Sequence, residues 1–77
     1  MRDSILEILR EQRPDVDFEN ETQLVSGGVL ESFDIVSIVA ELDDEFDISI
    51  GPKDLVASNF DSVEAITEMV ERLTEEE

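Results

Sequence analysis

The stretch that decides the fold is SFDIVSIVAELDDEFD, residues 32–47. Its apolar side chains recur at offsets of 0, 3, 4, 7 and 11 residues, which places them on one continuous face of an α-helix. The stretch therefore predicts a long amphipathic helix whose apolar face packs against a core. The residues of that face are Ile35, Ile38, Val39, Leu42 and Phe46.

A second, narrower apolar stripe lies nearly opposite the first when successive residues are turned by about 100°. A helix that faced only its own core would carry polar side chains there, so the stripe predicts a docking surface for another protein. The alternative is that Phe33 and Val36 pack beneath the preceding loop or a following short helix, although we expect Phe33 to be exposed or half-exposed. The stripe consists of Phe33, Val36 and Ala40, interleaved with Ser37, Asp43, Asp44 and Asp47.

The segment before this helix divides into a shorter helix and a long loop. Ser4 and Glu7 have the spacing of a capping box, and apolar residues follow at helical intervals. These features predict a helix over residues 4–12, which ends where Arg13 precedes a proline. Residues 14–31 show no sustained period, and a loop of that length in a compact domain usually has a role.

The segment after the central helix predicts one short and one long helix. Gly51 and Pro52 end the central helix, and residues 54–58 are long enough for one or two helical turns. Asp61 and Glu64 suggest the amino-terminal cap of a last helix. The apolar positions of that helix are Val63, Ile66, Met69, Val70 and Leu73, and its expected frayed end is Glu75, Glu76 and Glu77.

These elements predict an all-α fold: a small four-helix bundle of three long helices and one short third helix, with a long loop between the first two. At 77 residues the chain is expected to be a single domain over residues 1–77. Its hydrophobic content of 40% is enough for a packed core.

The charge of the chain restricts its partners. Five Lys and Arg against 22 Asp and Glu give a formal net charge of −17, which excludes non-specific binding to nucleic acid and argues against adsorption on an anionic membrane. We expect partners with basic patches, steered to the protein by its charge. Without a long apolar run or a signal segment, we expect a monomeric cytoplasmic protein that does not insert into membranes.

The chain contains no Cys and no His. Disulfides, thiolate nucleophiles and thiolate metal sites are therefore excluded, as are the usual general base near pH 7 and the commonest ligand of transition metals. We expect a protein that is not an enzyme and holds no metal ion.

Ser32 stands at the expected start of the central helix. A serine there is most often an N-cap, whose hydroxyl accepts a hydrogen bond from a free backbone N–H group. The same helix end also favours a phosphate group, through its free N–H groups and the positive end of the helix dipole. Spacing alone does not choose between a cap and a site of modification.

The sequence GVLESFDIVSIVAELDDEFDISI, residues 28–50, resembles the phosphopantetheine-attachment segment of acyl and peptidyl carrier proteins. That family carries a G-x-x-D-S-[LMF] motif before an acidic helix, and GVLES looks most like D-alanyl carriers and stand-alone peptidyl carriers. One position departs from the pattern, because Glu31 stands where the family has Asp. The matching residues are Gly28, Ser32, Phe33, Asp43, Asp44, Glu45, Phe46, Ile48 and Ile50.

The resemblance implies a bundle of the acyl-carrier type and a carrier function. A phosphopantetheinyl transferase would attach 4′-phosphopantetheine to Ser32, with Glu31 as the flanking acid, and the arm would supply the only thiol. A loading ligase or adenylating enzyme and a downstream acyltransferase or synthase would be the other partners. The cargo, D-alanine, another amino acid, a fatty acyl or a polyketide group, is not specified. The residues expected to meet these partners are Phe33, Asp34, Val36, Ser37, Ala40, Glu41, Asp43, Asp44 and Asp47.

Other classes of function remain open from the residues. The first is an unmodified, carrier-like acidic adaptor in which Ser32 is only a cap. The second is a calcium-binding protein, because residues 17–21 mimic the start of an EF-hand loop, but Thr22 and Gly28 occupy positions that require Gly and Glu. The third is an enzyme that uses paired carboxylates, for which no pocket or substrate motif accompanies the acidic run at residues 43–45.

Overall fold

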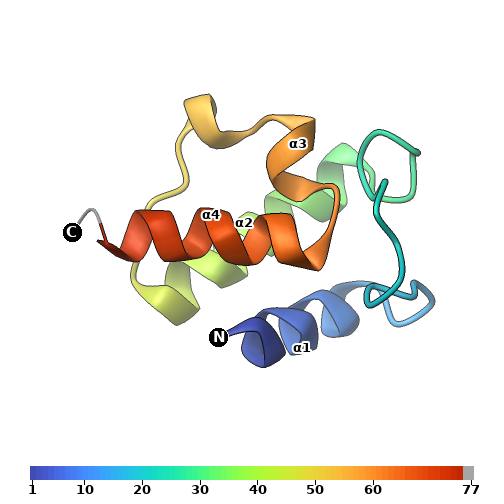
Figure 1. Ribbon diagram of the computed structural model, residues 1–77, viewed down its shortest axis with the longest axis horizontal. Helices are drawn as coiled ribbons and strands as arrows, with labels where there is room; N and C mark the ends of the chain where they lie inside the picture. Colours follow the sequence, from blue (N-terminus) through green and yellow to red (C-terminus); the bar gives the residue numbers. More distant parts are fainter. Residues whose placement is uncertain (76–77) are drawn as a thin grey trace.

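The computed structural model describes residues 1–75, and this part of the chain is helical, without strands (Figure 1). The expected all-α fold with three long helices and one short one is confirmed. In chain order the elements are α1 (Arg2–Gln12), α2 (Ser32–Phe46), the 3₁₀-helix η1 (Pro52–Asp54), α3 (Ala57–Phe60) and α4 (Val63–Glu75). Within residues 1–75, none of the helices is both long and apolar enough to cross a membrane.

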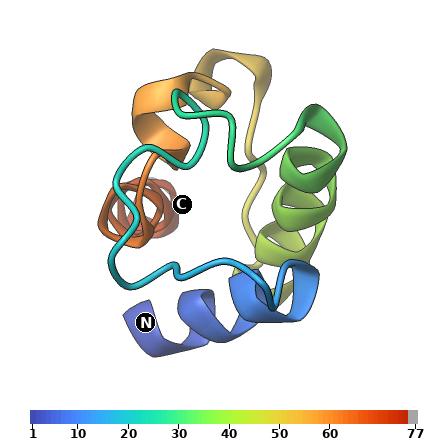
Figure 2. The same cartoon turned by 90° about the vertical axis from the view of Figure 1, so that its right-hand side faces the viewer.

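The three long helices surround one apolar core. Helix α1 packs against α2 and α4, and α3 packs against the start of α4 (Figure 2). Each helix contributes its apolar face; in α2 Ile38 and Leu42 are buried, while Ile35, Val39 and Phe46 are partly buried against the core, which confirms the predicted face. The fully buried side chains are Ile5, Leu9, Phe18, Leu24, Ile38, Leu42, Phe60, Val63, Ile66, Met69 and Val70.

The segment between α1 and α2 forms no helix or strand and runs around one end of the bundle (Figure 2). Phe18, Leu24 and Leu30 bury their side chains in the core and so fix its path. The Leu24 N–H group donates to the carbonyl of Asp61 at 2.9 Å, which ties the loop to the junction of α3 and α4. Gly28 has φ of 75°, a left-handed conformation that glycine adopts without steric cost.

The first helix begins earlier than its capping box predicts. The Met1 carbonyl accepts the Ile5 N–H at 3.1 Å, so α1 begins at Arg2 and Ser4 lies inside it. The predicted cap at Ser4 is therefore wrong, because the N–H groups it would satisfy belong to a turn that has already formed.

The region after α2 also differs in detail from the prediction. The expected helix over residues 54–58 is split: Pro52 starts the 3₁₀ turn, Val56 is extended with φ of −119° and ψ of 148°, and α3 follows. The Asn59 side chain donates to the Asp54 carbonyl at 2.9 Å and links the two turns.

The amino terminus of α4 is capped by Ser62, whose hydroxyl accepts the Ala65 N–H at 3.1 Å. The expected cap at Asp61 is wrong because the Asp61 carboxylate binds the long loop instead. Helix α4 continues through Glu75, and the predicted fraying of Glu76 and Glu77 lies outside the described residues.

Candidate functional site

Ser32 is the first residue of α2, and it is exposed. The N-cap is Glu31, in an extended conformation with φ of −97° and ψ of 167°, so of the two alternatives for Ser32 the structure contradicts the one in which it caps the helix. The Asp34 carboxylate supplies the capping bond by accepting the Glu31 N–H at 3.0 Å. The Ser32 hydroxyl is therefore not required to start the helix.

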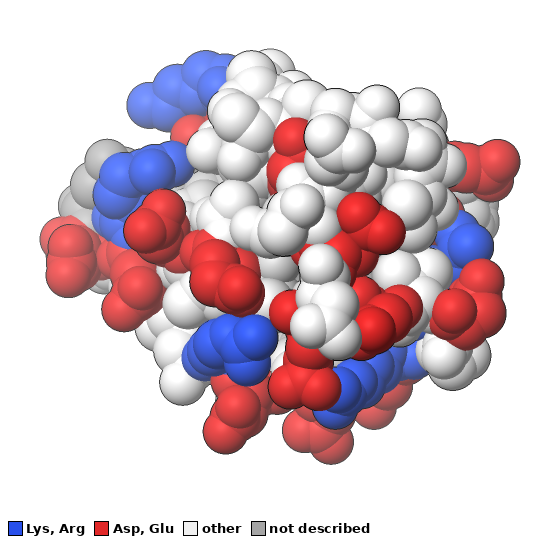
Figure 3. Space-filling view, turned by 45° about the vertical axis from the view of Figure 1, so that its right-hand side comes forward, with Lys and Arg blue, Asp and Glu red and all other residues white. Residues whose placement is uncertain are grey.

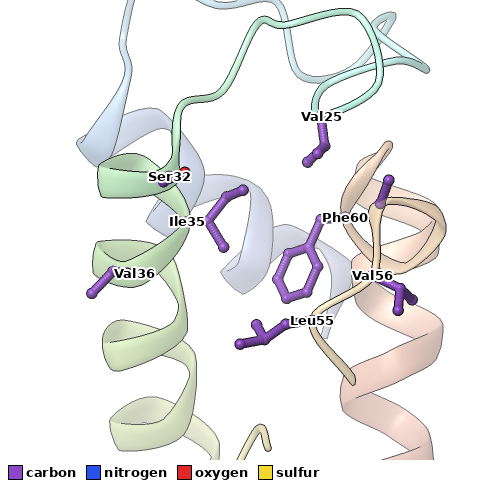
Figure 4. Close-up of a pocket in the computed structure, with 8 residues that line it drawn as sticks. Val25, Ser32, Ile35, Val36, Leu55, Val56 and Phe60 are labelled. Carbon is purple, nitrogen blue, oxygen red and sulfur yellow. The ribbon is translucent and has the colours of Figure 1, made fainter. Parts of the chain in front are cut away.

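A cleft of about 230 Å³ opens beside Ser32, between α2 and the segment that contains α3 (Figure 4). Ile35 of α2 and Phe60 of α3 point towards each other across it, and Leu55 extends into it from the chain before α3. Among residues 1–75, none of those that line the cleft is charged. The lining residues are Val25, Ser32, Ile35, Val36, Leu55, Val56, Ala57 and Phe60.

An exposed apolar surface surrounds this cleft. The exposed fraction of Phe33 is 80% and that of Val36 is 67%, so the stripe on α2 faces solvent and is not covered by the loop or by α3. Leu55 and Val56 extend the surface from the other side of the cleft and are each about half exposed. Neither residue was expected at a functional surface from the sequence, where they form only a pair of adjacent apolar residues outside any helical period.

Most of the other residues expected to meet partners are exposed, on α2 or directly after it. Glu41, Asp44 and Asp47 are exposed, as is Ala40, whereas Ser37 is half-buried. Figure 3 shows mostly uncharged surface over the upper right part of this face, with basic atoms at its upper left and most of the visible acidic side chains below it.

Two of the predicted partner-facing acids make bonds within the protein. Asp34 binds Arg13 at 2.8 Å between Oδ2 and Nη1, and its side chain is 16% exposed. Asp43 is half-buried, and its Oδ1 accepts the Ile50 N–H at 3.0 Å. Both carboxylates hold the ends of α2 to adjacent segments. Each therefore has fewer free oxygen lone pairs to accept hydrogen bonds from a partner.

A second groove, of about 240 Å³, lies between α1 and α2. It is lined by Ser4, Glu7, Ile8, Glu11, Glu41 and Glu45, so that four carboxylates share one small surface. Within residues 1–75, no group of three or more acidic side chains is arranged to hold a metal ion, either here or in the segment that mimics an EF-hand.

The surroundings of Ser32 are compatible with a covalently attached phosphopantetheine. The hydroxyl is accessible, and it stands at a helix end whose N–H groups and dipole favour an anionic phosphodiester. The uncharged cleft next to it would give such an arm apolar surface to lie against.

The chain was compared with protein-family models, curated proteins and solved structures, and no match was found in any of the three comparisons.

Proposed function

We propose that this protein is an acyl or aminoacyl carrier that holds its cargo as a thioester on a 4′-phosphopantetheine arm attached to Ser32. The main support is the uncharged cleft at Ser32 in a chain with 22 acidic residues. A serine that served only the helix would not need an accessible hydroxyl beside an apolar cleft. The resemblance of residues 28–50 to carrier proteins supports the same function.

In this proposal Ser32 is the acceptor of a group transfer. Its Oγ bonds to the phosphorus of coenzyme A that carries the pantetheine, the pyrophosphate bond breaks, and adenosine 3′,5′-bisphosphate leaves. The serine proton passes to a base of the transferase, because this chain has no His to receive it near pH 7. When attached, phosphopantetheine supplies the thiol that carries the acyl group.

The surface around Ser32 would serve the successive partner enzymes. Phe33 and Val36 offer exposed apolar area, and Glu41, Asp44 and Asp47 offer negative charge to Lys and Arg side chains. A small contact area with charges at its rim gives fast association and weak binding, which a carrier needs in order to leave each enzyme.

The test is the intact mass of the protein after incubation with coenzyme A, magnesium and a phosphopantetheinyl transferase of broad specificity. The wild type is expected to gain one phosphopantetheine, and Ser32→Ala none. Ser49→Ala is the matched control, because Ser49 is also an exposed serine, and it is expected to behave as the wild type. A gain that persists in Ser32→Ala, or no gain in the wild type with several transferases, would contradict the proposal.

Glu31 supports a second candidate, an unmodified adaptor, because it departs from the aspartate of the carrier motif. Glu31→Asp separates the two possibilities. A variant that is modified while the wild type is not would show that the longer side chain prevents modification. In that case the native protein would be the adaptor.

A further inference from the structure

We infer that Arg13 is a positioning residue for the modification of Ser32 and acts through Asp34; this inference rests on the proposed function. Arg13 lies directly after α1, and its Nη1 donates to the Asp34 carboxylate at 2.8 Å and to the Val29 carbonyl at 3.3 Å. Val29 and Asp34 stand on either side of Ser32 in the sequence. One guanidinium therefore joins the end of α1 to both flanks of the candidate attachment site.

The link continues from Asp34 to the residue that precedes Ser32. The same Asp34 oxygen that binds Arg13 accepts the Glu31 N–H at 3.0 Å. This bond fixes Glu31 in the extended conformation from which α2 begins. The position of the Ser32 hydroxyl consequently depends on the orientation of the Asp34 carboxylate.

The Arg13 guanidinium is itself held in place by Asp15. Its Nε and Nη2 donate to the two Asp15 oxygens at 3.1 and 3.0 Å, a paired geometry that arginine provides and lysine does not. The hydrogen bonds that Arg13 donates to Asp15 and Asp34 raise the pKa of its guanidinium still further above the neutral range. The Arg13 guanidinium, which orients Asp34, therefore has a fixed orientation and a constant positive charge.

The other ion pairs of the described chain do not reach Ser32. Arg2 pairs with Glu64 at 3.3 Å and Arg10 with Glu19 at 3.1 Å, both at exposed positions. Loss of either removes a weak surface contact. Loss of Arg13 leaves the half-buried Asp34 without a cation, close to Asp15 and Glu31, and the repulsion is expected to turn its carboxylate away from the Glu31 N–H.

Arg10 provides a control that matches Arg13 in charge. Arg13→Gln and Arg10→Gln each remove one positive charge near the end of α1, so the net charge that a transferase meets is the same in both variants. We expect kcat/KM for attachment at Ser32 to fall about tenfold in Arg13→Gln, mainly through kcat, because the acceptor is misplaced. We expect a change of less than about twofold in Arg10→Gln, and partial recovery in Arg13→Lys.

A second measurement distinguishes positioning from direct contact between Arg13 and the transferase. Hydrogen exchange of the Glu31 amide, followed by NMR on the free protein, is expected to accelerate in Arg13→Gln and to stay unchanged in Arg10→Gln. Asp34→Asn is expected to slow attachment similarly, and the double variant no further. Rates are measured well below the melting temperature of each variant, and Arg13→Lys and Asp34→Asn carry the test if Arg13→Gln does not fold.

The outcomes separate the inference from the proposed function. A wild type that no transferase modifies overturns the proposed function, and this inference with it. A modified wild type with Arg13→Gln at the wild-type rate overturns the inference alone. Slow attachment in Arg13→Gln with unchanged exchange at Glu31 also overturns it, because Arg13 would then act on the transferase and not on Asp34.

Discussion

Two grooves of almost equal volume lie on the two sides of α2, and they differ in almost everything else. The cleft towards α3 measures about 230 Å³ and is lined, within the described part of the chain, by uncharged residues, whereas the groove towards α1 measures about 240 Å³ and contains four glutamates. Both use residues of the same helix. The difference lies in which of its faces meets α1 and which meets the segment before α4.

The two grooves differ in whether they resemble the rest of the protein surface, which is mostly acidic. With 22 acidic residues in 77, the acidic groove is the ordinary surface of the chain and the uncharged cleft is the exception. The cleft also holds the candidate serine, and one of its lining residues is Phe60, a core residue that is 1% exposed. No cation pairs with the four glutamates of the groove among the described residues, so the groove opposes folding by repulsion.

The largest expected effect comes from removing the residue that joins the cleft to the core. Phe60→Ala is expected to lower the free energy of unfolding by about 3–5 kcal/mol, because it deletes a buried aromatic ring and leaves a cavity. Chemical denaturation measures this change. Leu55→Ala, at a half-exposed position in the same cleft, should lower the free energy of unfolding by about 1 kcal/mol. Equal decreases in the two variants would mean that Phe60 does not connect the cleft to the core.

The next effect concerns the loop that supplies Val25 to the cleft. The Asp61 carboxylate accepts the Val25 N–H at 3.0 Å, the Ser26 N–H at 2.8 Å and the Ser26 hydroxyl at 3.1 Å. Asp61→Asn is expected to lower the melting temperature at pH 7 by less than Phe60→Ala does. Asp44→Asn, at an exposed position of α2, is the control and should not lower it.

The contribution of Asp61 also has a defined dependence on pH. Hydrogen bonds from the Ser26 and Val25 backbone hold the pKa of Asp61 below its ordinary value of 3.8. A carboxylate whose pKa is lower in the folded state stabilises the protein above the unfolded-state value and loses that contribution as the pH falls through the folded-state value. The melting temperatures of the wild type and Asp61→Asn should therefore converge below about pH 4; a constant difference down to pH 2 would contradict this account.

A substitution in the acidic groove is expected to change the stability by a smaller amount and to raise it. Glu41 and Glu45 are four residues apart on α2 and repel each other, so Glu45→Lys should raise the stability by about 0.5–1 kcal/mol at low salt. That corresponds to a rise of about 2–8 °C in melting temperature for a domain of this size. Sodium chloride should raise the wild-type melting temperature and reduce the gain of the variant. A gain that is independent of salt would have another cause.

The smallest change in stability is expected at the exposed stripe. Phe33→Ala should alter the free energy of unfolding by less than about 0.5 kcal/mol, because 80% of the side chain is already in solvent. The same substitution should slow modification by the transferase if the stripe is a docking surface. A destabilised variant that is modified normally would show that Phe33 serves the fold instead.

Periodicity located the parts of the fold that depend on long apolar faces. The face from Ile35 to Phe46 predicted α2 and its core contacts, and the irregular segment before it was recognised as a loop. Short elements were placed less accurately. Helix α3 begins at Ala57 because Pro52 first starts a 3₁₀ turn and Val56 is extended, and no helical period distinguishes these residues.

The candidate site depends on contacts that no local pattern reveals. The exposure of Phe33 was predicted from its place on the helix, whereas the choice of Ser32 as the candidate site rests on the resemblance of residues 28–50 to carrier proteins. The bond between Arg13 and Asp34 spans 21 residues, and Asp34 appeared in the sequence only as one of many acids on α2. The cleft likewise requires Leu55 and Phe60 to lie opposite Ile35, an arrangement that follows from how α3 packs on α4.

The most direct test of the central claim uses the absence of cysteine. Because the chain has no thiol of its own, titration with a thiol reagent has no background from the protein. After treatment with coenzyme A and a transferase, followed by removal of the free coenzyme, the wild type is expected to show one thiol per chain and Ser32→Ala none. A treated wild type without a titratable thiol would contradict the account of this protein as a carrier.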